Sequence, residues 1–207
     1  MSGKSSKTVV LGTNNPDKLR EIKRLLKGSG VAVFPLNEFP KFPEAVEDGK
    51  TFVANARKKA RWVSTHTKSL TLADDSGLMV FSLNGRPGVA SARFAGPACS
   101  YRDNNRKLLW LLKKTPSSKR TAKFVCAMAL YDNGRPVAVV QEECRGRIAH
   151  AERGQKGFGY DPVFVPDGFS KTFAELLPAT KNRISHRGHA LRAAKRAVLN
   201  YLCKNSP

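Results

Sequence analysis

The sequence is short of acidic residues: 16 Asp plus Glu stand against 37 Lys plus Arg, which leaves a formal net charge of +21. Such a balance suits a polyanionic partner, either phosphate groups drawn to an active site or nucleic acid, and it equally suits a strongly basic, solvated surface. The basic residues are spread along the chain, as at 57–61 and 113–114, rather than gathered in one tail. Charge alone therefore leaves these alternatives open.

Long apolar runs are also missing. No stretch approaches the ~20 apolar residues that span a membrane, and Val9–Leu11 is far too short for the apolar core of a signal peptide. The four cysteines are widely scattered, with no C-x-x-C pair and no nearby His spacing that indicates zinc. We therefore expect a cytoplasmic protein with reduced cysteines and no membrane partner.

Several motifs are absent as well. The chain has no Walker A loop, and it has no RNP1-like aromatic strand, zinc-finger spacing or basic leucine-zipper pattern, so specific nucleic-acid binding is not expected. Internal repeats, low-complexity segments and an obvious linker are missing too. These absences favour a single domain that covers residues 1–207. Residues 1–7 are expected to form a flexible basic N-terminus.

The apolar periodicity indicates an α/β fold with a mixed sheet. Asn15 and Ser185 are predicted to cap helices, and Pro16 suits a first helical position. Asn133-Gly134 between two apolar runs is typical of a hairpin. The pattern predicts strands near residues 8–11, 31–36, 70–73, 78–83, 123–131 and 136–145, and helices near 16–27, after 51, after 103 and after 185.

Two acidic groups stand out in so basic a chain. Asp74-Asp75 is predicted to lie in a turn between two strands, and a turn alone explains Asp before Ser-Gly. Adjacent carboxylates repel each other unless a cation compensates them, however, and their oxygens suit magnesium, which also takes oxygens from substrate phosphates. A second acidic group lies at residues 44–48. A metal site formed by the two groups is therefore an alternative to the interpretation of Asp74-Asp75 as a turn alone.

Three further segments admit both a structural and a functional interpretation. The turn before Pro16 is either a simple cap or a phosphate cradle that Lys18 reaches from one turn into the helix. Residues 157–162 either pack two rings or let a flat ligand stack on Phe158 or Tyr160. His186-Arg187 is either a solvent-exposed helix start or a pair of donors for purine carbonyl oxygens.

Taken in order, these motifs resemble the Ham1-like, or inosine triphosphatase, family over about Val9 to Val198. The resemblance rests on residues 13–18, 74–78, 87–93, 157–162 and 181–187. It implies an elongated α/β fold in which a mixed central sheet and two lobes enclose a cleft, and commonly a homodimer. It also implies hydrolysis of ITP, dITP and XTP to the monophosphate and pyrophosphate with Mg²⁺.

The resemblance also implies residue roles. Asp75 is the expected general base and magnesium ligand, with Glu47 as the first choice of second ligand and Glu44 in reserve, because relatives often show paired Glu where this chain has Val46-Glu47-Asp48. Lys18 is expected to act in catalysis by neutralising the leaving pyrophosphate. The expected substrate-binding residues are Thr13, Asn14, Asn15, Pro16, Asp17 and Lys18 for the triphosphate, and Ser76, Phe158, Gly159, Tyr160, Asp161, Lys181, His186 and Arg187 for the rest of the nucleotide.

Two alternatives remain beside this hypothesis. One is a basic nucleic-acid-binding protein in which Asp74-Asp75 is only a turn. The other is a Maf-like nucleotide pyrophosphatase, against which the Ser-His-Arg and Phe-Gly-Tyr-Asp segments argue.

Overall fold

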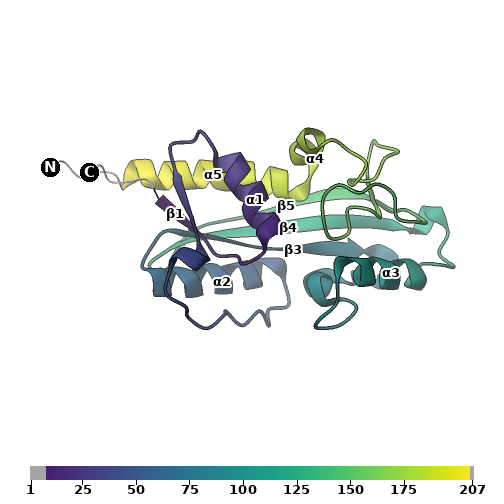
Figure 1. The fold of residues 1–207 in the computed structure, drawn as a ribbon, viewed down its shortest axis with the longest axis horizontal. Coiled ribbons are helices and arrows are strands. Elements are labelled where there is room, and N and C mark those ends of the chain that lie inside the picture. The colour runs from purple at the N-terminus through teal and green to yellow at the C-terminus, as the bar shows by residue number, and fades with distance from the viewer. Residues whose placement is uncertain (1–7, 206–207) are drawn as a thin grey trace. The chain divides into compact units, whose positions relative to one another are not determined.

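A computed structural model describes residues 8–205 of the chain (Figure 1). The flexible N-terminus predicted for residues 1–7 lies outside the described residues. The elements are β1 (Thr8–Leu11), α1 (Pro16–Leu26), β2 (Ala32–Pro35), η1 (Leu36–Glu38), α2 (Phe52–Thr67), β3 (Thr71–Val80), η2 (Phe81–Leu83), η3 (Gly88–Arg93), α3 (Tyr101–Leu111), η4 (Ser117–Lys119), β4 (Thr121–Asp132), β5 (Arg135–Ile148), β6 (Phe164–Pro166), α4 (Pro178–Ile184) and α5 (His186–Lys204).

The six strands form a mixed sheet in the order β2-β1-β3-β4-β5-β6. β1 pairs in parallel with β2 on one side and with β3 on the other, where Val10 lies opposite Thr71 and Leu11 opposite Leu72. β6 pairs antiparallel with β5. The predicted α/β class with a mixed sheet is confirmed.

The predicted helix caps are confirmed by their hydrogen bonds. The Asn15 side chain accepts from the backbone N–H groups of Asp17 and Lys18 at the start of α1, and the Ser185 hydroxyl accepts from Gly188 N–H at the start of α5. Each cap satisfies donors that have no partner within the helix. α3 begins earlier than predicted, at Tyr101, because Ser100 and Asp103 form a capping box.

The prediction for the aspartate pair is wrong in its local structure. We expected Asp74-Asp75 in a turn between two strands, but β3 runs unbroken from Thr71 to Val80 and both carboxylates lie within it. The turn propensity of Asp-Asp-Ser-Gly is overridden because each carboxylate finds a partner in the fold. The second expected strand is also shorter, since residues 81–83 form the 3-10 helix η2.

The predicted hairpin is confirmed. β4 and β5 flank Asn133-Gly134, whose φ angles of 44° and 80° are the two positive values that a type I′ turn needs. Figure 1 shows these as two long, neighbouring strands. Gly134 N–H also donates to the Ser64 hydroxyl of α2, at 3.0 Å.

The chain packs into two compact units. Within the described residues, unit 1 comprises residues 8–75, 127–141 and 190–205, and unit 2 comprises residues 76–126 and 142–189. β3, β4, β5 and α5 each contribute residues to both units. The single domain, the elongated shape and the cleft implied by the resemblance stay predictions.

Unit 1 has a core of aliphatic side chains from β1, α1, α2 and α5. Val9, Val10 and Leu11 of β1 are fully or almost fully buried, as is Ile22 of α1. Of the residues predicted to form the buried face of α5, Leu191, Ala194 and Val198 are buried and Leu202 is half-buried. The strand therefore lies in a packed interior, which fixes the turn that follows it.

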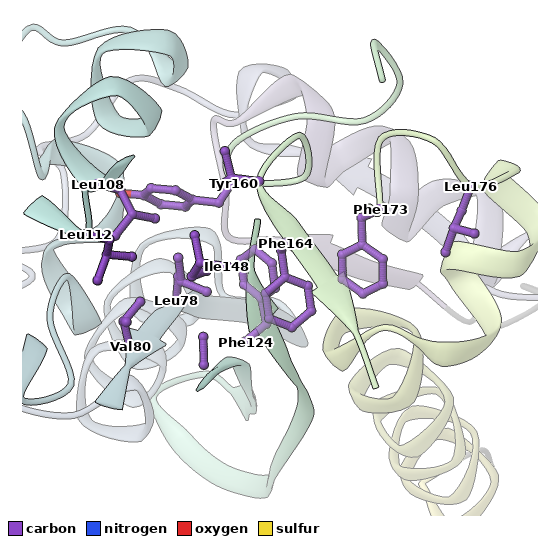
Figure 2. Packing of buried hydrophobic residues seen from close by; sticks show 12 residues of the cluster. Leu78, Val80, Leu108, Leu112, Phe124, Ile148, Tyr160, Phe164, Phe173 and Leu176 are labelled. Carbon is purple, nitrogen blue, oxygen red and sulfur yellow. The ribbon is translucent and has the colours of Figure 1, made fainter. Parts of the chain in front are cut away.

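Unit 2 has a core rich in aromatic rings (Figure 2). The ring centroid of Phe164 lies 4.7 Å from that of Phe124 and 5.1 Å from that of Phe173. Leu78 and Val80 bring the second half of β3 into the same cluster. Tyr160 belongs to it as well, and its hydroxyl donates to Ser91 O at 2.9 Å.

Within the described residues, no helix is long and apolar enough to cross a membrane. All four cysteines lie in this part of the chain and are free thiols.

Arg120 is a buried cation that links two other backbone segments of unit 2. The Arg120 side chain is 1% exposed, and its guanidinium donates to three backbone carbonyls. Nη1 reaches Leu112 O at 2.7 Å, Nε reaches Ile148 O at 2.8 Å, and Nη2 reaches Ala149 O at 2.7 Å. The end of α3 and the end of β5 are therefore held by one side chain.

Arg120→Met is expected to lower the free energy of unfolding by about 3 kcal/mol or more, because two buried carbonyls and a part-buried one lose a charged donor. Urea unfolding measures the change, and Arg102→Met, which alters an exposed arginine of α3, serves as the control with a change within about 0.5 kcal/mol. Equal stability of the Arg120 and Arg102 variants would contradict the role of Arg120.

Candidate functional site

In unit 1, the turn after β1 lies at the carboxyl end of two parallel strands. Because Leu11 pairs with Leu72, the residues that follow each of them lie side by side. The strands approach closely there: a Cβ on Gly12 would meet the Ala73 Cβ at 2.9 Å. The fold thus brings the predicted phosphate turn and the aspartate pair to one edge of the sheet, where ligands of α/β proteins bind.

The turn itself is organised by its own side chains. Thr13 is buried, and its hydroxyl accepts from Asn15 N–H at 3.2 Å. Asn15 Oδ1 in turn takes the N–H groups of Asp17 and Lys18, at 3.0 and 3.1 Å. These two N–H groups therefore serve the helix cap, and Pro16 and Asp17 lie in the first turn of α1.

Lys18 lies in a different setting from the one predicted. Its Nζ pairs with Asp74 Oδ2 at 2.9 Å, and its side chain is only 14% exposed. Asp74 is 1% exposed, so the pair is largely withdrawn from water. Lys18 therefore neutralises a buried carboxylate at this edge of the sheet.

Asp75 lies beside this pair with a neutral partner. Its Oδ2 accepts from Asn55 Nδ2 of α2 at 3.0 Å. Burial raises the pKa of Asp75, an effect opposed by the hydrogen bond from Asn55 and by the charges of Lys18 and Lys59. A carboxylate with a raised pKa is a stronger base, so this environment suits the predicted general base.

Lys59 is a functional candidate that the sequence analysis missed. Its Nζ pairs with Glu47 Oε1 at 2.7 Å and lies 3.4 Å from Asp74 O. Burial lowers the pKa of Lys59, but Asp74, Glu47 and Asp75 together raise it above its ordinary value, so it stays charged. Only its helical spacing from Asn55 on α2 could have indicated that it points to the same place.

The predicted metal ligands lie in this region without forming a cage. Glu47 is paired with Lys59, and Glu44 Oε1 accepts from Asn14 Nδ2 at 3.1 Å. Within residues 8–205, no group of three His, Cys, Asp or Glu side chains could by itself hold a metal ion. Magnesium usually takes only one or two protein carboxylates and completes its shell with water and substrate phosphates, so Asp75 with Glu47 fits this requirement.

In unit 2, the Gly-rich loop is closed by Asp161. Its Oδ2 accepts from Phe158 N–H at 2.8 Å and from Lys181 Nζ at 2.6 Å. Gly157 has φ +76°, and a Cβ there would collide with the same carboxylate oxygen. Asp161, which is expected to bind substrate, therefore also fixes the loop, and the lack of a Cβ at Gly157 makes room for its carboxylate.

The ring of Phe158 lies among cations. Lys181 Nζ is 5.0 Å and the Arg187 guanidinium carbon 5.2 Å from its centroid, within cation–π range. Tyr101 of α3 adds an aromatic neighbour at 5.9 Å. Phe158 is half-buried, whereas Tyr160 is a core residue, so of the two rings named in the sequence analysis only Phe158 is placed to stack on a ligand.

His186 and Arg187 are buried, at 4% and 5% exposure, so the solvent-exposed alternative is wrong. The His186 ring stacks on Phe124 with centroids 4.5 Å apart. Arg187 Nη2 donates to the Ser76 hydroxyl at 2.9 Å. The helix start capped by Ser185 thus holds two nitrogen-bearing side chains inside unit 2, with Arg187 close to Ser76 and Phe158 and His186 against Phe124.

The predicted site residues therefore form two groups. Unit 1 gathers acids and lysines beside the turn after β1: Thr13, Asn14, Asn15, Lys18, Glu44, Glu47, Asp74 and Asp75. Unit 2 gathers an aromatic ring and polar side chains around the Gly-rich loop: Ser76, Phe158, Gly159, Asp161, Lys181, His186 and Arg187. A sequence model described as the Ham1 family matches residues 9–197, almost the whole described chain.

The chain belongs to the Ham1 family. A Ham1 relative named dITP/XTP pyrophosphatase, from Geobacillus kaustophilus (strain HTA426), is 49% identical over 185 residues, which cover 89% of this chain and 91% of the relative. A protein of the same name from Desulforamulus reducens is 47% identical over 194 residues, covering 94% of this chain and 96% of that protein.

Solved structures of Ham1 proteins agree with this fold. The HAM1 protein from Coxiella burnetii superposes with a TM-score of 0.84 at 39% identity, covering 93% of this chain and 98% of that one. A nucleoside-triphosphatase / dITP/XTP pyrophosphatase from Mycobacterium abscessus superposes with a TM-score of 0.76 at 43% identity. The match covers 90% of this chain and 98% of that one.

Lys18→Met is expected to lower the free energy of unfolding by about 3 kcal/mol, because it leaves the Asp74 carboxylate buried without this partner. Replacing both residues, Lys18→Met with Asp74→Leu, should restore most of the loss, since no uncompensated charge remains. Denaturant unfolding of the single and double variants measures the coupling.

The control for this prediction is Arg20→Met, which removes an ion pair to Asp17 whose arginine is 77% exposed. Its stability should change by less than about 0.5 kcal/mol. A Lys18→Met variant as stable as this control would show that the pair with Asp74 does not contribute.

Proposed function

We propose that the chain hydrolyses non-standard purine nucleoside triphosphates, namely ITP, dITP and XTP, to the monophosphate and pyrophosphate, and thereby removes them from the nucleotide pool. The observation that carries the proposal is the Asp75 carboxylate, which is buried, accepts a hydrogen bond from Asn55 and is influenced by the charges of Lys18 and Lys59. The relatives named dITP/XTP pyrophosphatase, at 41–49% identity over most of the chain, support the same activity.

Asp75 supplies the base for this reaction. Water attacks the α-phosphorus, and Asp75 orients the water and takes its proton while the bond to pyrophosphate breaks. Asn55 holds Oδ2 of the carboxylate during this step. The proposed cofactor, Mg²⁺, held by Asp75 and Glu47, neutralises charge on the phosphates when it is bound.

Lys18 and Lys59 of unit 1 bind the triphosphate in this proposal. Lys18 and Lys59 are each paired with a carboxylate, Asp74 and Glu47. An incoming triphosphate competes with these carboxylates for the ammonium groups, and Asn14 offers a further donor in the adjacent turn. The lysines thus stabilise the negative charge that builds on the leaving pyrophosphate.

The residues of unit 2 read the base. Phe158 stacks on the purine, and Lys181, His186 and Arg187 offer donors to the 6-oxo group that inosine and xanthosine carry. Adenine presents an amino group at that position, which leaves a buried donor facing another donor. This mismatch disfavours ATP without any steric barrier.

The +21 net charge suits nucleic acid as well as phosphate groups, but no further observation favours either alternative from the sequence analysis. The match to the Ham1 family over residues 9–197 favours neither a nucleic-acid-binding protein nor a Maf-like enzyme. The homodimer implied by the resemblance and the cytoplasmic location stay predictions.

The purified chain with Mg²⁺ is expected to release pyrophosphate, not orthophosphate, from dITP and XTP. Asp75→Asn should lower turnover by about 10²- to 10⁴-fold, because the amide keeps the shape but can no longer take a proton. Product identification by phosphorus NMR and a circular-dichroism check of the fold complete the measurement. Near wild-type turnover of Asp75→Asn would assign the base to another residue.

Replacing Arg187, which is proposed to contact the base, should reduce the preference for ITP and XTP over ATP. Arg187→Ala is expected to reduce kcat/KM for ITP and XTP far more than for ATP, whereas Phe158→Ala should weaken all purines evenly, since stacking does not depend on exocyclic groups. Arg183→Ala, an exposed arginine of α4, is the control. Equal losses for ITP and ATP in Arg187→Ala would show that this residue does not read the base.

A further inference from the structure

Residues 40–50 have neither helix nor strand, yet they carry the second acidic group. We call them the acidic strap. Hydrogen bonds and ion pairs attach the strap to α2 along its length: Trp62 Nε1 donates to Pro43 O at 2.7 Å, Lys59 pairs with Glu47, and Lys58 pairs with Asp48. The Phe42 ring also stacks on His66, with centroids 4.8 Å apart.

The side chains of α2 that hold the strap share one helical face. Asn55, Lys59, Trp62 and His66 follow one another at intervals of four, three and four residues, the spacing that places side chains in one row. The strap therefore takes its position from a rigid helix instead of from its own backbone pattern. The position of the acidic group therefore depends on the positions of these four side chains.

Asn55 is the member of this row that also reaches the base. Its Oδ1 accepts from Gly49 N–H of the strap at 2.7 Å, and its Nδ2 donates to Asp75 Oδ2 at 3.0 Å. Rotating the amide by half a turn would set its NH₂ against the Gly49 N–H and its oxygen against a carboxylate. Both contacts therefore require the same orientation of the amide.

The helical position of residue 55 does not by itself explain why it is an asparagine. Asn is a weaker helix former than Ala, and burying an amide is unfavourable unless both ends are bonded. Asn55 is 1% exposed, and its two ends are bonded to residues from two other segments. A Cβ on Gly49 would lie 2.5 Å from Asn55 Oδ1, so the strap backbone fits closely against this amide.

We propose that Asn55 is a positioning residue that fixes the catalytic carboxylate of Asp75 and the acidic strap as one unit. The inference rests on the proposed pyrophosphatase activity. Asn55 acts through Asp75 on one side and through Gly49 on the other. Loss of the amide should misplace the base relative to the phosphates, and a displacement of about 1 Å can cost roughly 10²-fold in rate.

Asn55→Leu keeps the shape of the side chain and removes both contacts. It should lower kcat for dITP by about 10- to 100-fold while KM changes less than about threefold, because the lysines and the base-reading residues remain. Asn55→Asp keeps an acceptor for Gly49 N–H but turns a carboxylate toward Asp75, so it should lose kcat too. If Asn55 served only the strap, Asn55→Asp would retain kcat.

Gly49→Ala tests the same unit from the other side. Its Cβ must displace either the strap or the Asn55 amide, so kcat should fall although neither Asn55 nor Asp75 has been changed. Hydrogen exchange gives a readout independent of activity: the Gly49 amide should exchange markedly faster in Asn55→Leu than in the wild type, and at near wild-type rate in Asn55→Asp.

Asn104→Leu is the matched control. Asn104 is 2% exposed, and its amide oxygen accepts from Ala95 N–H and the Cys99 thiol while its nitrogen donates to Ala92 O; none of these three residues is assigned to the site. It should lower stability about as much as Asn55→Leu and leave kcat unchanged. If Asn55→Leu does not fold, Asn55→Asp and Gly49→Ala carry the test.

The outcomes separate the two proposals. A folded wild type that releases no pyrophosphate from any purine triphosphate would overturn the proposed function. An active wild type whose Asn55 and Gly49 variants keep kcat within about threefold, or an Asn104→Leu that loses kcat as severely, would overturn the role of Asn55.

Discussion

The parallel pairing of β1 with β3 is the constraint on which the phosphate-side residues depend. It sets Leu11 opposite Leu72, so that the turn at Thr13 and the carboxylates at 74 and 75 follow at the same edge of the sheet. The lack of a Cβ at Gly12 lets the strands approach there. Without this register, Lys18 would have no carboxylate to pair with, and Asp75 would lie away from the helix that holds it.

Much of this arrangement follows from local sequence. The caps at Asn15 and Ser185, the turn at Asn133-Gly134 and the main helices depend on short-range hydrogen bonds and on apolar spacing, which a sequence displays directly. The candidate residues were found because family motifs extend along nearly the whole chain. Their gathering into two groups is a property of the fold, since each group draws on segments far apart in the sequence.

The failures share one physical cause, which is that burial is not visible in local composition. Asp74-Asp75 has the composition of a turn but continues a strand, because Lys18 and Asn55 satisfy the carboxylates. Lys18 was expected to reach a phosphate from the first turn of its helix, and its side chain is mostly buried in an ion pair with Asp74. Asn55 and Lys59 were missed because a polar residue on a helix usually faces solvent, and only the tertiary structure shows which ones do not.

The discontinuous make-up of unit 1 has a consequence for biosynthesis. Its core combines residues 8–75 with the hairpin turn region and with α5, which begins only at His186. A ribosome therefore delivers the turn at Thr13 and the base at Asp75 long before the helix whose Leu191, Ala194 and Val198 fill the same interior. During that interval the apolar core of unit 1 has the side chains of α1 and α2 but lacks those of α5, so part of its apolar surface stays exposed until the last helix is made.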